Sequence, residues 1–192
     1  LDQADIAQQG LPADCSPAAI VLRTAQSLYF IGDFAGAAGT LEAEESRLDA
    51  SREPNLAAAW HFWLSHLVLR LGKPHQCIDA ARRSIHLGQA VGDHATMGKA
   101  DGVLVMSAEH LGDYVLGETE AKASTELLTR VSEPYWLGMT HFYLGWMRMM
   151  AGQFVDALAC QDQAYDLAIA ISDKRLLTYC LFGKRSEEHT SE

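Results

Sequence analysis

The tetrapeptides IGDF (31–34), LGKP (71–74), LGDY (111–114) and AGQF (151–154) recur along the chain at intervals of 40 residues. The same spacing relates HFWLS (61–65) to HFYLG (141–145), which lie two intervals apart. A period that stays in phase over this distance without a gap predicts a chain built from structural repeats.

Other positions keep the same phase. Small residues stand five positions after each repeated glycine: Ala37, Cys77, Gly117 and Ala157. Acidic residues stand 21 positions after it: Glu53, Asp93, Glu133 and Asp173. Small residues at fixed positions indicate close helix packing, and an acid before a helix is favoured by the positive end of the helix dipole.

Each interval has the features of two helices. Apolar and small residues after Phe154 follow the three-and-four spacing of an amphipathic helix. Gly152 is placed to end the preceding helix in a left-handed conformation, and Pro54 is placed in the first turn of another. Ser16 followed by Pro17 predicts an N-cap and a first helical residue.

These signals predict an all-α chain and no strand. The expected helices are 17–31, 35–50, 54–71, 74–91, 94–111, 114–130, 134–151, 154–171 and a truncated 174–183. They form an array over 16–183 with units at about 16–53, 54–93, 94–133 and 134–173, and a truncated fifth unit from 174. Residues 1–12 are interpreted as the remnant of a preceding helix or linker.

The repeated positions resemble the tetratricopeptide repeat (TPR) family, in a long variety of 40 residues. The clearest copy has Leu144-Gly145, then Gly152 at the turn, then Phe154 and Ala157. The departures from the family pattern are Glu44 at a small position, Pro74 at an aromatic position, Asp101 where a large apolar residue is usual, and His61 and His141 at the same position, where the family's usual aromatic is missing. The resemblance implies a right-handed solenoid of about four helical hairpins that binds proteins rather than catalysing a reaction.

The stretches CIDAARRSIHLGQAVGD (77–93), EHLGDY (109–114) and ELL (126–128) are also similar to the C-terminal helical regions of bacterial multidomain signalling proteins. Those proteins carry cyclase, kinase or ATPase domains, and similar arrays occur in transcriptional activators. That resemblance implies a scaffold or regulatory module within a larger protein. The alternative is a module that senses a peptide or small molecule. Residues 185–192 resemble a translated sequencing adapter, so they are left out of the fold prediction.

Composition favours a folded protein, because 48% of the residues are hydrophobic and 21% are charged. The formal net charge of -10 gives no electrostatic footprint for nucleic acid or for an anionic membrane. The cysteines Cys15, Cys77, Cys160 and Cys180 lack CxxC spacing, so we expect reduced thiols and a cytoplasmic location.

Sequence motifs for chemistry are not found. The glycines of IGDFAGAAG (31–39) are not followed by the Lys-Ser or Lys-Thr of a phosphate-binding loop. His61 and His66 are five positions apart and share no helix face, so we expect no metal. His61 and His141 occupy one repeat position, which favours a structural role such as a hydrogen bond between helices. We therefore expect no enzyme activity, no cofactor and no catalytic residue in this chain.

The first helix of each unit would form the concave face, according to the resemblance. Its candidate partner-binding residues are Gln26, Tyr29, Phe62, His66, Arg70, Met106, Glu109, His110, Phe142, Trp146 and Met149. Such a groove of Met and aromatic residues suits an amphipathic or extended peptide from a protein partner, and other domains of the same chain are included among the expected partners. The competing interpretation is that longer helices bury these side chains, which is the usual fate of an apolar stripe.

Overall fold

The computed structural model describes residues 16–188, and this part of the chain is helical throughout, with short turns and no strand. The prediction of an all-α chain is confirmed for these residues. The helices are α2 (Pro17–Phe30), α3 (Phe34–Glu44), the short 3₁₀ helix η1 (Glu45–Arg47), α4 (Pro54–Arg70), α5 (Pro74–Val91), α6 (His94–Leu111), α7 (Tyr114–Arg130), α8 (Pro134–Met150), α9 (Phe154–Ala170) and α10 (Lys174–Glu188).

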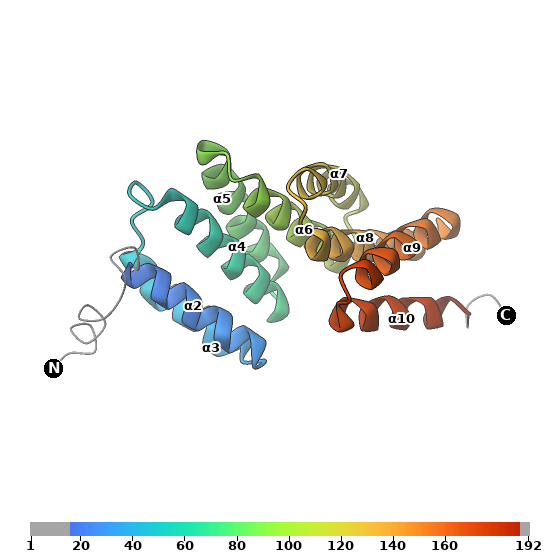
Figure 1. Ribbon diagram of the computed structural model, residues 1–192, viewed down its shortest axis with the longest axis horizontal. Coiled ribbons are helices and arrows are strands. Elements are labelled where there is room, and N and C mark those ends of the chain that lie inside the picture. Colours follow the sequence, from blue (N-terminus) through green and yellow to red (C-terminus); the bar gives the residue numbers. More distant parts are fainter. Residues whose placement is uncertain (1–15, 189–192) are drawn as a thin grey trace.

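Successive helices pack against one another in pairs, α2 with α3, α4 with α5, α6 with α7 and α8 with α9. Figure 1 shows these pairs following one another along the long axis of the molecule. The helices α2, α4, α6, α8 and α10 also contact each other in succession. They therefore form an inner layer, on which the alternate helices are packed.

The turn within each pair requires a left-handed residue. Gly32, Gly72, Gly112 and Gly152 have φ angles of 90°, 74°, 68° and 76°. A residue with a Cβ atom adopts this conformation only at a cost, which explains the 40-residue recurrence of glycine. The turns between pairs have the same requirement at Gly92, Ser132 and Ser172, a second 40-residue series with φ of 70°, 57° and 54°.

The N-terminal ends of the helices follow the sequence signals. The Ser16 hydroxyl accepts a hydrogen bond from the Ala19 amide at 3.2 Å, so it caps α2. Asp93 and Asp173 cap α6 and α10 through their carboxylates, at 3.0 and 2.8 Å. Glu53 and Glu133 occupy the same place but make no side-chain cap. The repeated acidic position is thus an N-cap position, and its side chain caps the helix only where the acid is aspartate.

Small residues allow the close packing that the repeat predicts. Ala37, Cys77 and Ala157 are at most 1% exposed. A methyl group on Gly117 would lie 2.4 Å from Met147 Sδ, so a side chain there would displace a core residue. The large side chains that fill the interior include Trp60, Leu67, Leu104, Leu128, Met139 and Met147.

Two helices differ from their predicted bounds by more than one residue. A helix over 35–50 was predicted, but α3 ends at Glu44 and is followed by η1 and a loop up to Glu53. The corresponding position in later units holds Ser84, Ser124 or Ala164, each 0% exposed. A glutamate cannot occupy that buried site without a partner, so the helix ends there.

The last helix, α10, reaches Glu188 instead of 183, because residues 184–188 include no proline and are compatible with helical geometry. The proposed helix remnant at 1–12 and residues 189–192 lie outside the described residues. Cys77, Cys160 and Cys180 are buried thiols, as expected, and Cys15 also lies outside the described part. None of the described helices is long and apolar enough to cross a membrane.

Candidate functional site

The two ends of the inner layer meet through one hydrogen bond. Arg175 Nη2, in the first turn of α10, donates to the Tyr29 hydroxyl near the end of α2 at 2.9 Å. The guanidinium carbon also lies 5.2 Å from the centre of the Tyr29 ring, within the range of a cation–π contact. The same hydroxyl is 3.1 Å from His66 Nε2 of α4. One tyrosine therefore joins three inner helices.

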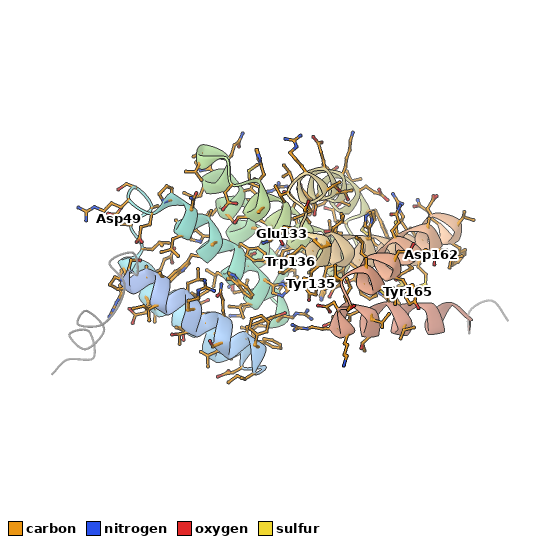
Figure 2. The ribbon with its side chains drawn as sticks, viewed as in Figure 1. Asp49, Glu133, Tyr135, Trp136, Asp162 and Tyr165 are labelled. Atoms are coloured by element: carbon orange, nitrogen blue, oxygen red, sulfur yellow. The ribbon has the colours of Figure 1, made fainter. Side chains whose placement is uncertain are left out.

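Aromatic rings surround this contact. Trp63 lies edge-on to Tyr29 with 5.3 Å between ring centres. Trp136 of α8 lies edge-on to Phe62 at 5.0 Å and to His66 at 5.4 Å. These spacings are typical of favourable aromatic pairs. Figure 2 shows Tyr135 and Trp136 in the middle of the molecule, between α4 and α10.

A pocket of about 380 Å³ opens at this place. It is lined by Tyr29 and Phe30 from α2, Trp63 from α4, Tyr135 and Trp136 from α8, and Asp173 and Arg175 at the start of α10. Its walls are thus aromatic, with one cation and one carboxylate at the rim. Phe30 is 70% exposed, so an apolar surface is available at the mouth. Such a pocket suits a large apolar or aromatic group that also carries a polar atom.

Electrostatics leave the buried histidine neutral. Burial lowers the pKa of His66 to about 3, and the nearby charges of Arg70 and Arg175 act in the same direction. Burial raises the pKa of Tyr135 to about 12, with Arg175 opposing that shift. The positive charge at this site is therefore carried by the arginines, which leaves the His66 imidazole and the Tyr135 phenol as neutral hydrogen-bonding groups.

Several predicted binding residues are buried, so the prediction that they face a partner is wrong for most of their surface. Tyr29, Phe62, His66, Met106 and Phe142 are between 1% and 7% exposed. They pack between inner helices. Inner helices of 17 or 18 residues bring more of their length against their neighbours than the resemblance to TPR repeats implies. A partner cannot reach most of their surface. Tyr29 still contributes its ring edge to the pocket.

The other candidates retain accessible surface. Arg70, Gln26, Trp146 and Met149 are half-buried. Gln26 accepts a 3.3 Å hydrogen bond from Arg23, and the Trp146 ring stacks on Phe142 at 6.5 Å.

Glu109 is half-buried and His110 is exposed. His110 Nδ1 lies 3.0 Å from a Glu109 carboxylate oxygen and 2.8 Å from the Met106 carbonyl. Of the predicted binding residues, Tyr29 alone lines the pocket. His66 contacts the Tyr29 hydroxyl from behind the lining, and the charge of Arg70 acts on His66.

Five lining residues were not predicted from sequence: Trp63, Tyr135, Trp136, Asp173 and Arg175. Tyr135 and Arg175 are separated by 40 positions and each follows the first residue of an inner helix. That coincidence is a signal which sequence reasoning could have used. Whether α10 approaches α2 depends on the curvature of the whole array, which no local pattern specifies.

Buried polar groups occupy a second repeated position outside the pocket. His61 and Asp101 are 3% and 4% exposed, and His141 is half-buried. The hydrogen bond between helices that the sequence predicts is not made through Nδ1 of either histidine, because that atom is buried without a partner in both rings. Asp101 instead belongs to a network in which Glu120, 6% exposed, accepts a 2.6 Å hydrogen bond from Arg82.

Metal-ligating side chains do not gather in the described part of the chain, where no group of three or more His, Cys, Asp or Glu residues has the geometry to hold an ion. No model of a known protein family matches the chain, and a search of curated proteins finds no similar sequence. The features that bear on function are therefore the geometry of the pocket and of the inner layer.

Proposed function

We propose that the chain is a right-handed solenoid of TPR-like hairpins that acts as a protein interaction module. The 40-residue period, the left-handed turn residues and the succession of inner helices support this proposal. Arrays of this kind stack each unit on the next and present extended surfaces to partners.

The observation that carries the functional proposal is the pocket that four inner helices form together. Its aromatic walls, the exposed Phe30 ring and the Arg175 guanidinium match the way proteins bind a peptide side chain. The occupant we propose is a segment of a protein partner that inserts one large apolar side chain. Arg175 then offers a hydrogen bond to a carbonyl or carboxylate of the same segment.

The proposal also covers the location of the chain, the protein that contains it and its partner. The module works in the cytoplasm as a scaffold or regulatory part of a larger bacterial signalling protein, and its partner is a protein, which includes other domains of the same chain. Its role is to bind and position, so catalysis lies elsewhere in that protein. Nucleic acid and membranes are not its proposed partners, given the net charge of -10.

A small-molecule sensor is the second candidate. The pocket volume of about 380 Å³ favours it, because this volume falls within the range of small-ligand sites. A ligand that bridges α2 and α10 would hold the two ends of the inner layer at a fixed separation. Binding of a metabolite at this pocket would then act on the curvature of the array.

The test is selection of a displayed random-peptide library on the whole chain, followed by affinity measurements on the enriched peptides. We expect peptides with a large apolar residue, and a loss of roughly tenfold in affinity for Phe30→Ala. Val155→Ala is the matched control, because Val155 is 82% exposed but does not line the pocket. Equal effects of the two substitutions would contradict the proposed site, and a thermal-shift screen with metabolites tests the sensor alternative.

A further inference from the structure

A second pocket lies where α3 ends early. It has a volume of about 440 Å³ and is lined by Glu45, Leu48, Ala50, His61, Arg82, Arg83, His86 and Leu87. The first three belong to η1 and the loop that follows it, His61 belongs to α4, and the last four belong to α5. Asp49, labelled in Figure 2, lies on this loop between two lining residues.

The origin of this pocket is the shortened second helix of the first unit. α3 has 11 residues, whereas α5, α7 and α9 have 17 or 18. An irregular segment therefore covers the α5 face that carries Arg82, Arg83 and His86. The pocket is specific to this unit, because the other units continue with regular helix at the corresponding place.

The polar lining is rich in nitrogen donors. Two guanidiniums and two imidazoles face a single carboxylate, that of Glu45, although the whole chain carries a formal charge of -10. Arg83 Nη1 lies 3.2 Å from Glu45 Oε1, and Arg82 Nη2 lies 2.6 Å from Glu120 Oε1, outside the pocket. A guanidinium has five N–H donors, so each arginine keeps donors for a further acceptor.

His61 supplies a separate observation at the inner end of the pocket. The side chain is 3% exposed and its Nδ1 has no hydrogen-bond partner. Burial lowers its pKa, and the charge of Arg83 acts in the same direction. A buried imidazole with unmet hydrogen-bonding capacity is costly, and a ligand that enters this pocket can offer it a partner.

We propose that this pocket binds a small organic phosphate. The phosphate group contacts Arg82, Arg83 and His86, and the organic part lies against Leu48 and Leu87. A phosphate monoester offers three terminal oxygens and close to two negative charges, which matches several converging donors better than a carboxylate with two oxygens. The volume exceeds that of a bare phosphate ion, so the apolar wall has room for the rest of the ligand.

The site is distinct from the aromatic pocket, since the two share no lining residue. Failure of one proposal therefore leaves the other intact. Phe30→Ala, the variant that tests peptide binding, should leave phosphate binding unchanged.

The test is a calorimetric titration of the whole chain with phenyl phosphate at low ionic strength. We expect saturable binding that Arg83→Gln weakens by roughly tenfold, the usual effect of removing one charge-assisted hydrogen bond. Glu45→Gln should strengthen binding, because it removes the one carboxylate that repels the ligand and competes for Arg83.

Arg130→Gln is the matched control. The Arg130 side chain is 58% exposed and pairs with Glu126 at 3.2 Å, which closely resembles the 63% exposure and 3.2 Å of Arg83. Circular dichroism shows whether each variant remains folded, and Glu45→Gln tests the site by a gain that misfolding cannot produce.

The outcomes separate clearly. Stronger binding of phenyl phosphate than of inorganic phosphate or benzoate, with opposite effects of Arg83→Gln and Glu45→Gln, supports the proposal. Benzoate binding as tightly as phenyl phosphate overturns the assignment to phosphates. The absence of saturable binding, or an equal loss in Arg130→Gln, overturns the site itself.

Discussion

Arg175 and Tyr29, which are 146 positions apart in the sequence, form a hydrogen bond of 2.9 Å. This bond joins the last inner helix to the first one and places both at the aromatic pocket. The relationship shows that the inner layer bends back enough for its ends to touch. The pocket is consequently a property of the whole array and not of any one unit.

The first prediction concerns this bond. Arg175→Gln should lower the free energy of unfolding by about 0.5–1.5 kcal/mol, the usual net value of one hydrogen bond. Tyr29→Phe should lower it more, because the hydroxyl also bonds to His66. Because both changes remove the same contact, a double-mutant cycle measured by urea unfolding should show a coupling of similar size. Strictly additive effects would mean that the ends of the array do not touch in solution.

The second prediction concerns Asp101. Burial and the adjacent Glu120 together raise the pKa of this carboxyl to about 7, against the opposing charge of Arg82. The folded state therefore keeps a proton that the unfolded state releases between about pH 4 and 7. The contribution to stability is complete below about pH 4 and is lost as the pH rises to about 7, with a slope of at most about 1.4 kcal/mol per pH unit.

Asp101→Asn tests this, because the amide can still donate a hydrogen bond to Glu120 and does not titrate. Urea unfolding should show that the variant is more stable than the wild type at pH 8 and nearly equal to it at pH 4. A difference in free energy of unfolding between the two proteins that stays constant from pH 4 to 8 would contradict the raised pKa of Asp101.

The third prediction has the opposite sign and concerns His66. Its folded pKa of about 3 lies below the ordinary value of 6.5, so the unfolded state takes up a proton first as the pH falls. The stability that neutral His66 provides is complete above about pH 6.5 and is lost as the pH falls towards 3.

As the pH falls from 6.5 to 4.5, His66→Phe should therefore lose less stability than the wild type. The difference between the two free energies of unfolding should change by up to about 1.4 kcal/mol per pH unit. At pH 8 the variant should be less stable by about 1 kcal/mol, because Tyr29 loses a hydrogen-bond partner. Parallel stability curves for the two proteins below pH 6.5 would show that His66 titrates normally.

The fourth prediction concerns the turns. Gly152→Ala should lower the free energy of unfolding by about 1–2 kcal/mol, because its φ angle of 76° is unfavourable for alanine. No atom lies within 4 Å of the added methyl group, so the whole cost comes from the backbone conformation. Gly39→Ala is the control: its added methyl group also meets no atom within 4 Å, but it lies within α3 and should gain about 0.5–1 kcal/mol. Chemical denaturation of both variants provides the measurement.

The sequence determined the local structure of this protein because local structure depends on neighbouring residues. Gly32 and Gly152 predicted left-handed turns, and Pro54 predicted a helix start at the residue where the structure has it. The failure at Glu44 is also physical: the residue disagreed with its repeat position, and only the packed structure shows that the helix ends in response.

The tertiary structure alone decided which side chains are accessible and which distant ones meet. Met106 and Phe142 were expected on a binding surface but are core residues, since long inner helices bury them. Arg175 reaches Tyr29 because the angles between successive inner helices sum to that approach. That sum is set by packing between helices, for which a single sequence holds no local signal, so both pockets could be found only in three dimensions.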